Sequence, residues 1–337
     1  MADRPGLPAP VNAVRAVALC AALALCGTAA LCGCGLRSGQ AIADPVQPGS
    51  IGQGKPLRGV TLTVTSKNFS EQIILGEMMG LALKAAGATV IDKTNIQGSI
   101  GARQAVLKGT ADAMYEYTGT AWITYLGHTR PITDPHAQWQ AVRDQDARNG
   151  LTWLPPATLD NTYALASNQA NQRRYGYSTL SDVAALSRSD PGVVTLCVEN
   201  EFDVRDDGLP GMEKAYGMRI PVRNIRIMDS GIVYTQVSQG TSCALGEVFT
   251  TDGRIAARHL RVLADDRHFF PDYNAAPEIN SRSLRSHPAI ATVLEPITAK
   301  LTTENQRRLN AKVDVDGQDP REVAKDWLVR EGFIKSG

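Results

Sequence analysis

The residues from Val60 to Gly87 read VTLTVTSKNFSEQIILGEMMGLALKAAG, and this stretch decides the expected fold. Val60, Leu62 and Val64 alternate with polar residues, as in a β-strand with one buried face. A helical run follows and ends at Gly87, a residue type that commonly terminates helices. Ser70 is the expected N-cap of this helix. A strand joined by a short loop to a helix is the unit from which α/β domains are built.

The same alternation of strands and helices continues along most of the chain. The other expected strands lie at residues 88–92, 111–115, 162–166, 193–198, 224–228 and 244–249, and the expected helices at 101–108, 181–186, 232–238 and from Pro210 onward. The last helix is expected to begin at Asp319 and Pro320, with Glu322 in its first turn. The roughly 300 residues that follow the N-terminal signal are more than a single hydrophobic core usually organises. The sequence therefore predicts two α/β lobes with a ligand in the cleft between them.

The N-terminus has the layout of a secretory signal. Two arginines precede an apolar run from Ala16 to Leu31, which leads into Leu31-Cys32-Gly33-Cys34. Bacterial lipoprotein signals require an aliphatic residue three positions before the modified cysteine and a small one directly before it. The alternative, an uncleaved membrane helix, is disfavoured because the run is shorter than the roughly 18 residues that a span needs. We expect residues 1–33 to be a signal peptide and Cys34 to be lipidated.

The stretch after the signal is expected to be a flexible tether, from residue 34 to residue 57. It is rich in Gly, Pro, Ser and Gln and has little hydrophobic periodicity. No later stretch approaches the length of a membrane helix. We therefore expect a body held by its lipid at the outer face of the cytoplasmic membrane, and not a channel.

The composition excludes several classes of function. The chain has 35 basic and 34 acidic residues and no long basic run, so nucleic acid is not an expected partner and a small, nearly neutral ligand fits better. There is no Gly-x-Ser-x-Gly elbow and no His-Glu-x-x-His helix, and the five histidines lack metal-ligand spacing. We therefore expect no catalytic residues, no metal and no cofactor, and the protein is not expected to be an enzyme.

Cys197 and Cys243 are the cysteines that remain after the signal and the lipidated position are set aside. In an exported protein they could form a disulfide. Both lie in short apolar runs expected to be buried strands, so two buried free thiols are the alternative. The sequence leaves these two possibilities open, because a disulfide requires a particular approach of the two Cβ atoms.

Two motifs carry a resemblance to a known family. The stretches Thr65–Gln72 (TSKNFSEQ) and Tyr115–Thr120 (YEYTGT) resemble the osmoprotectant-binding proteins of ABC importers, the glycine betaine/carnitine/choline family. Further matching blocks follow in the same order at Trp153–Pro156, Asn161–Leu165, Leu209–Gly211, Thr250–Arg254 and His268–Pro277. The resemblance thus covers nearly the whole body of the chain.

The resemblance implies a two-lobe periplasmic-binding-protein fold of type II, with the ligand in the interlobe cleft. The first lobe would hold residues 58–159 and 271–337, and the second would hold residues 160–270. The two crossovers between the lobes then fall just before Tyr163 and Tyr273, which places both tyrosines near the cleft.

The family binds its ligands in an aromatic cage, and the matching positions are Tyr117, Tyr163, Phe249 and Tyr273. A quaternary ammonium has no N–H to donate, so ring faces around its polarised methyl groups must recognise it. For each ring, core packing is the alternative role. Phe249 departs from the tyrosine of the family pattern; it keeps the ring face and lacks the hydroxyl.

The family pattern also supplies donors for the carboxylate end of a betaine, at positions matching Lys67, Thr120 and Arg205. Arginine suits this role because its planar fork can bind two oxygens at once. Glu201 lies four residues before Arg205 and could orient it by pairing within a helical turn. The alternative for this pair is a solvated surface salt bridge.

The expected function is capture of quaternary-ammonium solutes such as glycine betaine, choline, carnitine or proline betaine outside the cytoplasm. The partners would be ABC permease subunits with a separate ATPase, because this chain lacks membrane spans and a phosphate-binding loop. The alternative is the same fold binding another small solute, such as an amino acid, a polyamine or an aromatic compound.

Overall fold

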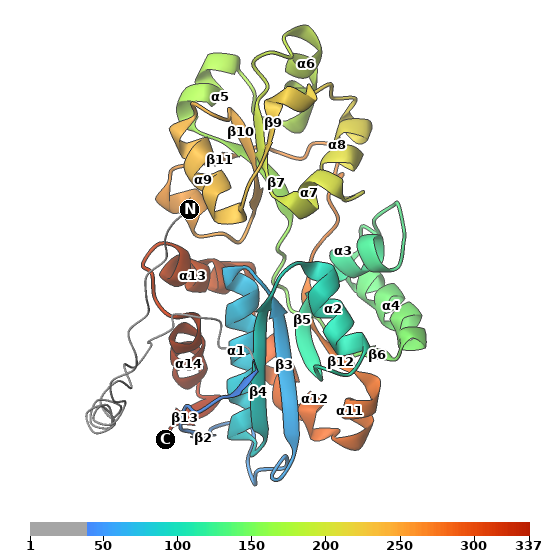
Figure 1. The fold of residues 1–337 in the computed structure, drawn as a ribbon, viewed down its shortest axis with the longest axis vertical. Coiled ribbons are helices and arrows are strands. Elements are labelled where there is room, and N and C mark those ends of the chain that lie inside the picture. The colour runs from blue at the N-terminus through green and yellow to red at the C-terminus, as the bar shows by residue number, and fades with distance from the viewer. Residues whose placement is uncertain (1–38) are drawn as a thin grey trace, which may run out of the picture. The chain divides into compact units, whose positions relative to one another are not determined.

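The computed structural model describes residues 39–337, which fold around two large β-sheets, with a third sheet of only two strands (Figure 1). We call the part built on the six-stranded sheet the first lobe and the part built on the five-stranded sheet the second lobe. The chain leaves the first sheet after Trp153, enters the second at Tyr163, leaves it after Val262 and returns at Ala275. The two-lobe α/β fold predicted from the sequence is present.

The first lobe has the strand order β1-β4-β3-β5-β12-β6. Its strands are β1 (Gln40–Ala41), β3 (Thr61–Lys67), β4 (Thr89–Ile96), β5 (Ala113–Tyr117), β6 (Leu151–Trp153) and β12 (Ala275–Asn280). Its helices are α1 (Ser70–Ala85), α2 (Ser99–Leu107), α3 (Thr118–Thr120), α4 (Pro135–Asp146), α11 (Ser281–Ser286), α12 (Ala289–Thr298), α13 (Thr303–Asp314) and α14 (Pro320–Arg330). The central strands β4, β3 and β5 are parallel, and β12 returns antiparallel between β5 and β6.

The second lobe has the strand order β11-β7-β10-β8-β9. Its strands are β7 (Tyr163–Ser167), β8 (Leu196–Val198), β9 (Ile225–Ile227), β10 (Leu245–Phe249) and β11 (Arg261–Val262). Its helices are α5 (Gln169–Tyr175), α6 (Leu180–Ser189), α7 (Asn200–Val204), α8 (Leu209–Tyr216), α9 (Ser230–Gln239) and α10 (Arg254–Ala257). The strands β7, β10 and β8 are buried because helices cover the sheet, which explains their short, continuous apolar runs, whereas β9 and β11 at the edges are largely exposed.

The two crossover segments lie side by side. The Asn161 amide donates to the Tyr273 carbonyl at 3.1 Å, and the Tyr273 amide donates to Asp160 Oδ1 at 2.7 Å. These bonds fix the backbone beside Tyr163 and Tyr273. Both tyrosines are therefore held at the junction of the lobes by main-chain contacts.

The helix that follows the first long strand begins as predicted, but its expected cap is wrong. Phe69 occupies the N-cap position of α1, and no side chain caps this end of the helix. The Ser70 hydroxyl instead donates to Asp314 Oδ1 in α13, at 2.5 Å. The cap predicted at the last helix is confirmed, since Asp319 accepts bonds from the amides of Arg321 and Glu322.

The prediction of a flexible tether is wrong for residues 39–57. Here β1 pairs with β4, and β2 (Val46–Pro48) pairs with β13 (Ile334–Ser336) at the C-terminal end of the chain. Ile42, Val46 and Leu57 are buried in the first lobe. These strands span two or three residues, too few to show alternation, and their partners lie far away in the sequence. The predicted signal, the lipidated Cys34 and the first residues of the predicted tether lie outside the described residues.

Cys197 and Cys243 are joined in a disulfide, with their Cα atoms 5.7 Å apart. Cys197 lies in β8, and Cys243 comes just before the neighbouring strand β10. The bond therefore resolves the alternative that the sequence left open, in favour of the bridge. Within residues 39–337, no helix combines the length and the apolar character needed to cross a membrane.

Candidate functional site

A cavity of about 390 Å³ opens between the two lobes. The first lobe contributes the ends of β3, β4 and β5 with the loops that follow them, and the second contributes β7, the start of α7, the start of α9 and the end of β10. This is the edge where parallel strands of α/β sheets present their carboxyl ends, the usual place for ligands. All eight predicted site residues line the cavity: Lys67, Tyr117, Thr120, Tyr163, Glu201, Arg205, Phe249 and Tyr273.

Five aromatic rings form a continuous series along the cavity, in the order Tyr117, Phe69, Phe249, Tyr163 and Tyr273. Successive ring centroids are 6.3, 5.2, 5.2 and 5.4 Å apart. Tyr117 and Phe69 belong to the first lobe, whereas Phe249 and Tyr163 belong to the second. Rings from both lobes thus meet in the cleft.

Phe69 is the ring that the sequence prediction of the site missed. It precedes α1, is half-buried, and stacks on Phe249 with an angle of 10° between the ring planes. It lies within the matching block at residues 65–72, but a phenylalanine before a helix looks like ordinary core packing. Only its stacking across the cleft distinguishes it.

Strand register and hydrogen bonds position the rings of this series. Phe249, the last residue of β10, is the direct antiparallel partner of Tyr163, the first residue of β7. The Tyr117 hydroxyl donates to Glu71 Oε1 and the Tyr273 hydroxyl donates to Asp207 Oδ2, each at 2.7 Å. Burial raises the pKa of all three tyrosines well above its usual value, so the hydroxyls remain protonated and the rings uncharged at neutral pH.

Lys67 is already bound to a carboxylate of the protein. Its Nζ lies 2.5 Å from Glu116 Oε1, and both side chains are buried. Glu116 also accepts from the Tyr117 amide and from the Tyr125 hydroxyl, each at 2.7 Å. The ammonium of Lys67 lies 5.0 Å from the centre of the Tyr117 ring. Lys67 therefore borders the series of rings as half of a buried ion pair.

Arg205 directly follows α7 and is bound by a second carboxylate. Its Nε and Nη2 donate to the two oxygens of Asp207 at 2.7 and 2.5 Å. Nη2 also reaches Thr120 Oγ1 across the cleft at 3.4 Å. The guanidinium carbon lies 5.5 Å from the centre of the Tyr163 ring. The same Asp207 accepts from the Tyr273 hydroxyl, so Arg205 and the rings of Tyr163 and Tyr273 form one assembly.

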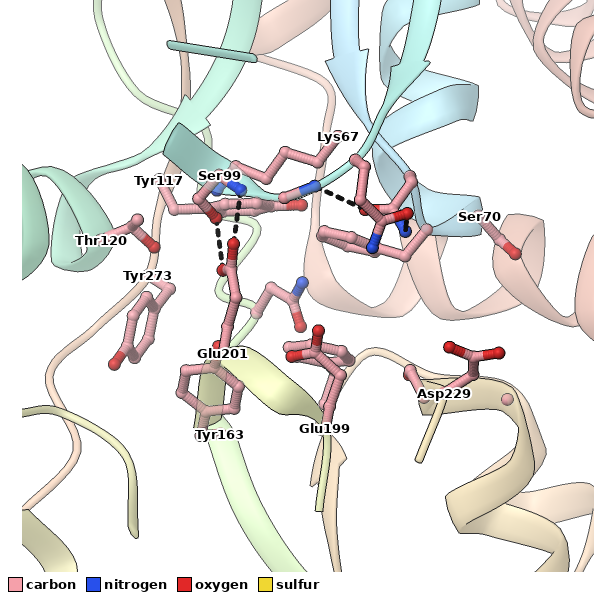
Figure 2. Close-up of a pocket in the computed structure, with 18 of the residues that line it drawn as sticks. Lys67, Ser70, Ser99, Tyr117, Thr120, Tyr163, Glu199, Glu201, Asp229 and Tyr273 are labelled. Atoms are coloured by element: carbon pink, nitrogen blue, oxygen red, sulfur yellow. Dashed lines mark hydrogen bonds between the residues drawn. The ribbon is translucent and has the colours of Figure 1, made fainter. Parts of the chain in front are cut away.

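Glu201 connects the two lobes, as Figure 2 shows. Its carboxylate accepts from the Ser99 amide at 2.5 Å and from the Ser99 hydroxyl at 2.7 Å, at the N-terminus of α2. The pairing expected with Arg205 is also present, with Oε2 3.5 Å from Nη1. Burial opposes ionisation of Glu201, but Lys67, the bonds from Ser99 and Arg205 together lower its pKa. Glu201 is therefore ionised at neutral pH.

Two further carboxylates line the cavity and were not predicted. Glu199 is half-buried and Asp229 is exposed at the rim, and in Figure 2 both carboxyl groups face the space between the lobes. Burial and the neighbouring Glu201 raise the pKa of Glu199. Each residue immediately precedes a helix, where an acidic side chain is commonplace, so nothing in the sequence pattern distinguishes them as site residues.

Glu247 provides a test of the electrostatics beside the site. It is buried in β10, and its pKa is raised to about 8 because burial opposes ionisation and Glu199 adds like charge. A carboxyl with a raised pKa stabilises the folded state fully below its unfolded value of 4.5, and this contribution is lost as the pH rises through about 8.

Substitution Glu247→Gln is expected to remove this dependence. From about pH 5 to about pH 8, the wild type should lose up to about 1.4 kcal/mol of stability per pH unit relative to the variant. Urea unfolding of both proteins at the two pH values measures the difference. Parallel pH profiles would contradict the assignment.

The described residues contain no group of three or more His, Cys, Asp or Glu side chains arranged to hold a metal ion. What the cavity offers is an aromatic surface flanked by fixed charges, on a two-lobe body whose crossovers run beside it. Fold and site together define a two-lobe solute-binding protein.

Comparison with known proteins identifies the family. Residues 60–330 match the family described as the substrate binding domain of ABC-type glycine betaine transport systems, and the chain belongs to this family. The predicted family resemblance is therefore confirmed, and with it the class of extracytoplasmic transport protein.

Individual relatives agree with this assignment. A glycine-betaine-binding protein of Pseudomonas aeruginosa is 37% identical over 282 residues, covering 82% of this chain and 90% of the relative. The carnitine transport binding protein OpuCC of Listeria monocytogenes is 29% identical and covers 86% of this chain and 91% of its own length. A crystal structure titled as a glycine betaine/carnitine/choline ABC transporter superposes with a TM-score of 0.65 at 28% identity, over 81% of this chain and 99% of that one.

Proposed function

We propose that this protein captures a quaternary-ammonium solute in the interlobe cavity and delivers it to an ABC importer. The observation that carries the proposal is the series of five rings contributed by both lobes. The names of the relatives support the ligand class, since they bind glycine betaine or take part in carnitine transport.

The chemistry of the ligand explains why rings are needed. A trimethylammonium group spreads its charge over methyl groups and donates no N–H bond, so ring faces are its best protein partners. Tyr117, Tyr163 and Tyr273 carry hydroxyls on strongly buried rings, and Phe69 and Phe249 add faces without hydroxyls. At roughly 0.5–2 kcal/mol per desolvated ring, several rings supply a large share of the roughly 8 kcal/mol of micromolar binding.

Capture works through the relative stability of open and closed forms. Tyr117 approaches the solute from the first lobe and Tyr163 from the second, so a bound solute contacts both lobes only when they are together. A ligand that binds the closed form more tightly shifts the population toward it. The closed form is then the one that a separate permease, driven by its own ATPase, receives.

We place the protein in the cell envelope, on the outer face of the cytoplasmic membrane. Lipidation of Cys34 after removal of residues 1–33 is the proposed anchor, on the basis of the Leu31-Cys32-Gly33-Cys34 pattern. Metabolic labelling with a fatty acid, followed by comparison of the wild type with Cys34→Ala, tests the anchor. Labelling that survives the substitution would contradict it.

Tyr163 gives the direct test of the cage. Tyr163→Leu removes the ring face and is expected to weaken binding of a trimethylammonium solute by roughly 1–2 kcal/mol, which is about 5- to 30-fold. Tyr163→Phe keeps the ring and should retain affinity within about twofold. Calorimetric titration measures both variants.

The conservative variant is the matched control, because both substitutions remove the hydroxyl and only one removes the ring. Thermal unfolding of the free proteins verifies that each variant folds. Equal affinities of Tyr163→Leu and Tyr163→Phe for the solute, with both proteins folded, would show that the Tyr163 ring does not contribute to binding.

A further inference from the structure

The cavity has three features that could receive the carboxylate of a zwitterionic solute: the Lys67 ammonium, the Arg205 guanidinium and the N-terminus of α2 at Ser99. Each of them is already bound to a carboxylate of the protein. Glu116 binds Lys67 at 2.5 Å, and Asp207 binds Arg205 at 2.7 Å. Figure 2 shows the third case, in which Glu201 crosses the cleft to Ser99.

The remaining cation of the lining is also neutralised. Arg254 Nε donates to Asp252 Oδ1 at 2.9 Å, and Asp252 is buried. Lys67, Arg205 and Arg254 are thus each matched by a carboxylate that lies outside the lining, namely Glu116, Asp207 and Asp252.

Three carboxylates of the lining are left over, from Glu199, Glu201 and Asp229. Within residues 39–337, Glu199 and Asp229 form no salt bridge, and Glu201 approaches Arg205 only at 3.5 Å. The charge balance of the cavity wall therefore favours a positively charged ligand. A solute carboxylate would meet donors that are already occupied and would stand near like charges.

We infer that this cavity selects cationic trimethylammonium alcohols of the choline class over zwitterionic betaines, and that Glu201 is the residue that enforces the preference. The inference rests on the proposed function, because it presupposes a quaternary-ammonium ligand. Glu201 holds the α2 N-terminus and faces Arg205, which are the positions that a betaine carboxylate would need. A betaine must displace Glu201 or bind beside it, whereas a cationic ligand is attracted by the negative charge of Glu201.

Substitution Glu201→Gln isolates the charge, because the amide oxygen can still accept from Ser99. Choline and glycine betaine are titrated calorimetrically into the full-length wild type, into Glu201→Gln and into Asp203→Asn. Asp203 lies in the same helix, α7, and does not line the cavity, so Asp203→Asn changes the net charge equally. We expect the wild type to bind choline at least about tenfold more tightly than glycine betaine. Glu201→Gln should lower that ratio by about tenfold, and Asp203→Asn should leave it unchanged.

The other outcomes distinguish a failure of this inference from a failure of the proposed function. Equal or tighter binding of glycine betaine by the wild type overturns the inference and leaves the proposed function standing. A ratio that Glu201→Gln does not change, or that Asp203→Asn changes as much, overturns the role of Glu201. Binding of neither solute by the wild type overturns the proposed function, and this inference with it.

Discussion

Replacing Arg103 with methionine is expected to lower the free energy of unfolding by about 3–5 kcal/mol, because it leaves two buried carboxylates without their cation. Arg103 Nη1 donates to Asp146 Oδ2 at 2.9 Å and to Glu278 Oε1 at 2.5 Å. Arg103 is 5% exposed, and both acids are fully buried. Methionine fills much of the same volume with a flexible apolar chain, so the loss reports mainly the uncompensated charges.

The position of Arg103 ties this network to the cavity. Its guanidinium carbon lies 4.4 Å from the centre of the Tyr125 ring, and the Tyr125 hydroxyl donates to Glu116, the partner of Lys67. We therefore expect Arg103→Met to disturb the cavity edge as well as the stability of the first lobe.

Urea unfolding measures the effect, and Arg308→Met is the matched control. Arg308 forms an exposed pair with Glu304 on α13, so its loss should cost less than about 1 kcal/mol. Equal destabilisation by the two substitutions would contradict the claim that the burial of its ion pairs makes Arg103 important for stability.

Reduction of the Cys197–Cys243 disulfide is expected to lower the free energy of unfolding by about 4 kcal/mol. The bond closes a loop with a sequence separation of 46 residues, and in the chain-entropy description such a loop restricts the unfolded chain by about this amount. It also joins β8 to the entry of β10, the strand that ends at Phe249. The bond therefore supports the part of the second lobe that carries Phe249, a ring of the cavity.

Unfolding with and without a thiol reductant measures this contribution. The double variant Cys197→Ala/Cys243→Ala is the control, because it should resemble the reduced wild type and should not respond to reductant. A wild type whose stability is the same in both conditions, with the bond verified as broken, would contradict the prediction.

The alternation of strands and helices, the two lobes and four of the five rings could be predicted from the sequence. Val60, Leu62 and Val64 gave a clear strand period, and the resemblance carried residue types onto positions such as Tyr163 and Tyr273. These features depend on short-range patterns or on matching blocks, both of which are readable along a single chain.

Apart from the Glu201–Arg205 pair, whose spacing of four residues predicted it, the partners of the charged site residues could not be predicted. Glu116 lies 49 residues from Lys67 and Ser99 lies 102 residues from Glu201, so their pairing depends on how the lobes fold. Lys67 and Arg205 were expected to be free to bind the carboxylate of a ligand, because the sequence alone does not reveal that carboxylates of the protein bind them. The strands at residues 40–48 were missed for the same reason, since their partners stand far along the chain.

The most direct test of the central claim is calorimetric titration of the purified protein with choline and glycine betaine, beside their carbon isosteres. In each isostere, a neutral tert-butyl group replaces the trimethylammonium with almost the same shape. We predict saturable binding of at least one quaternary ammonium, and binding at least about tenfold weaker for its isostere, because ring faces attract the positive charge. Equal binding of a quaternary ammonium and its isostere, or no binding of either quaternary ammonium, would contradict the account.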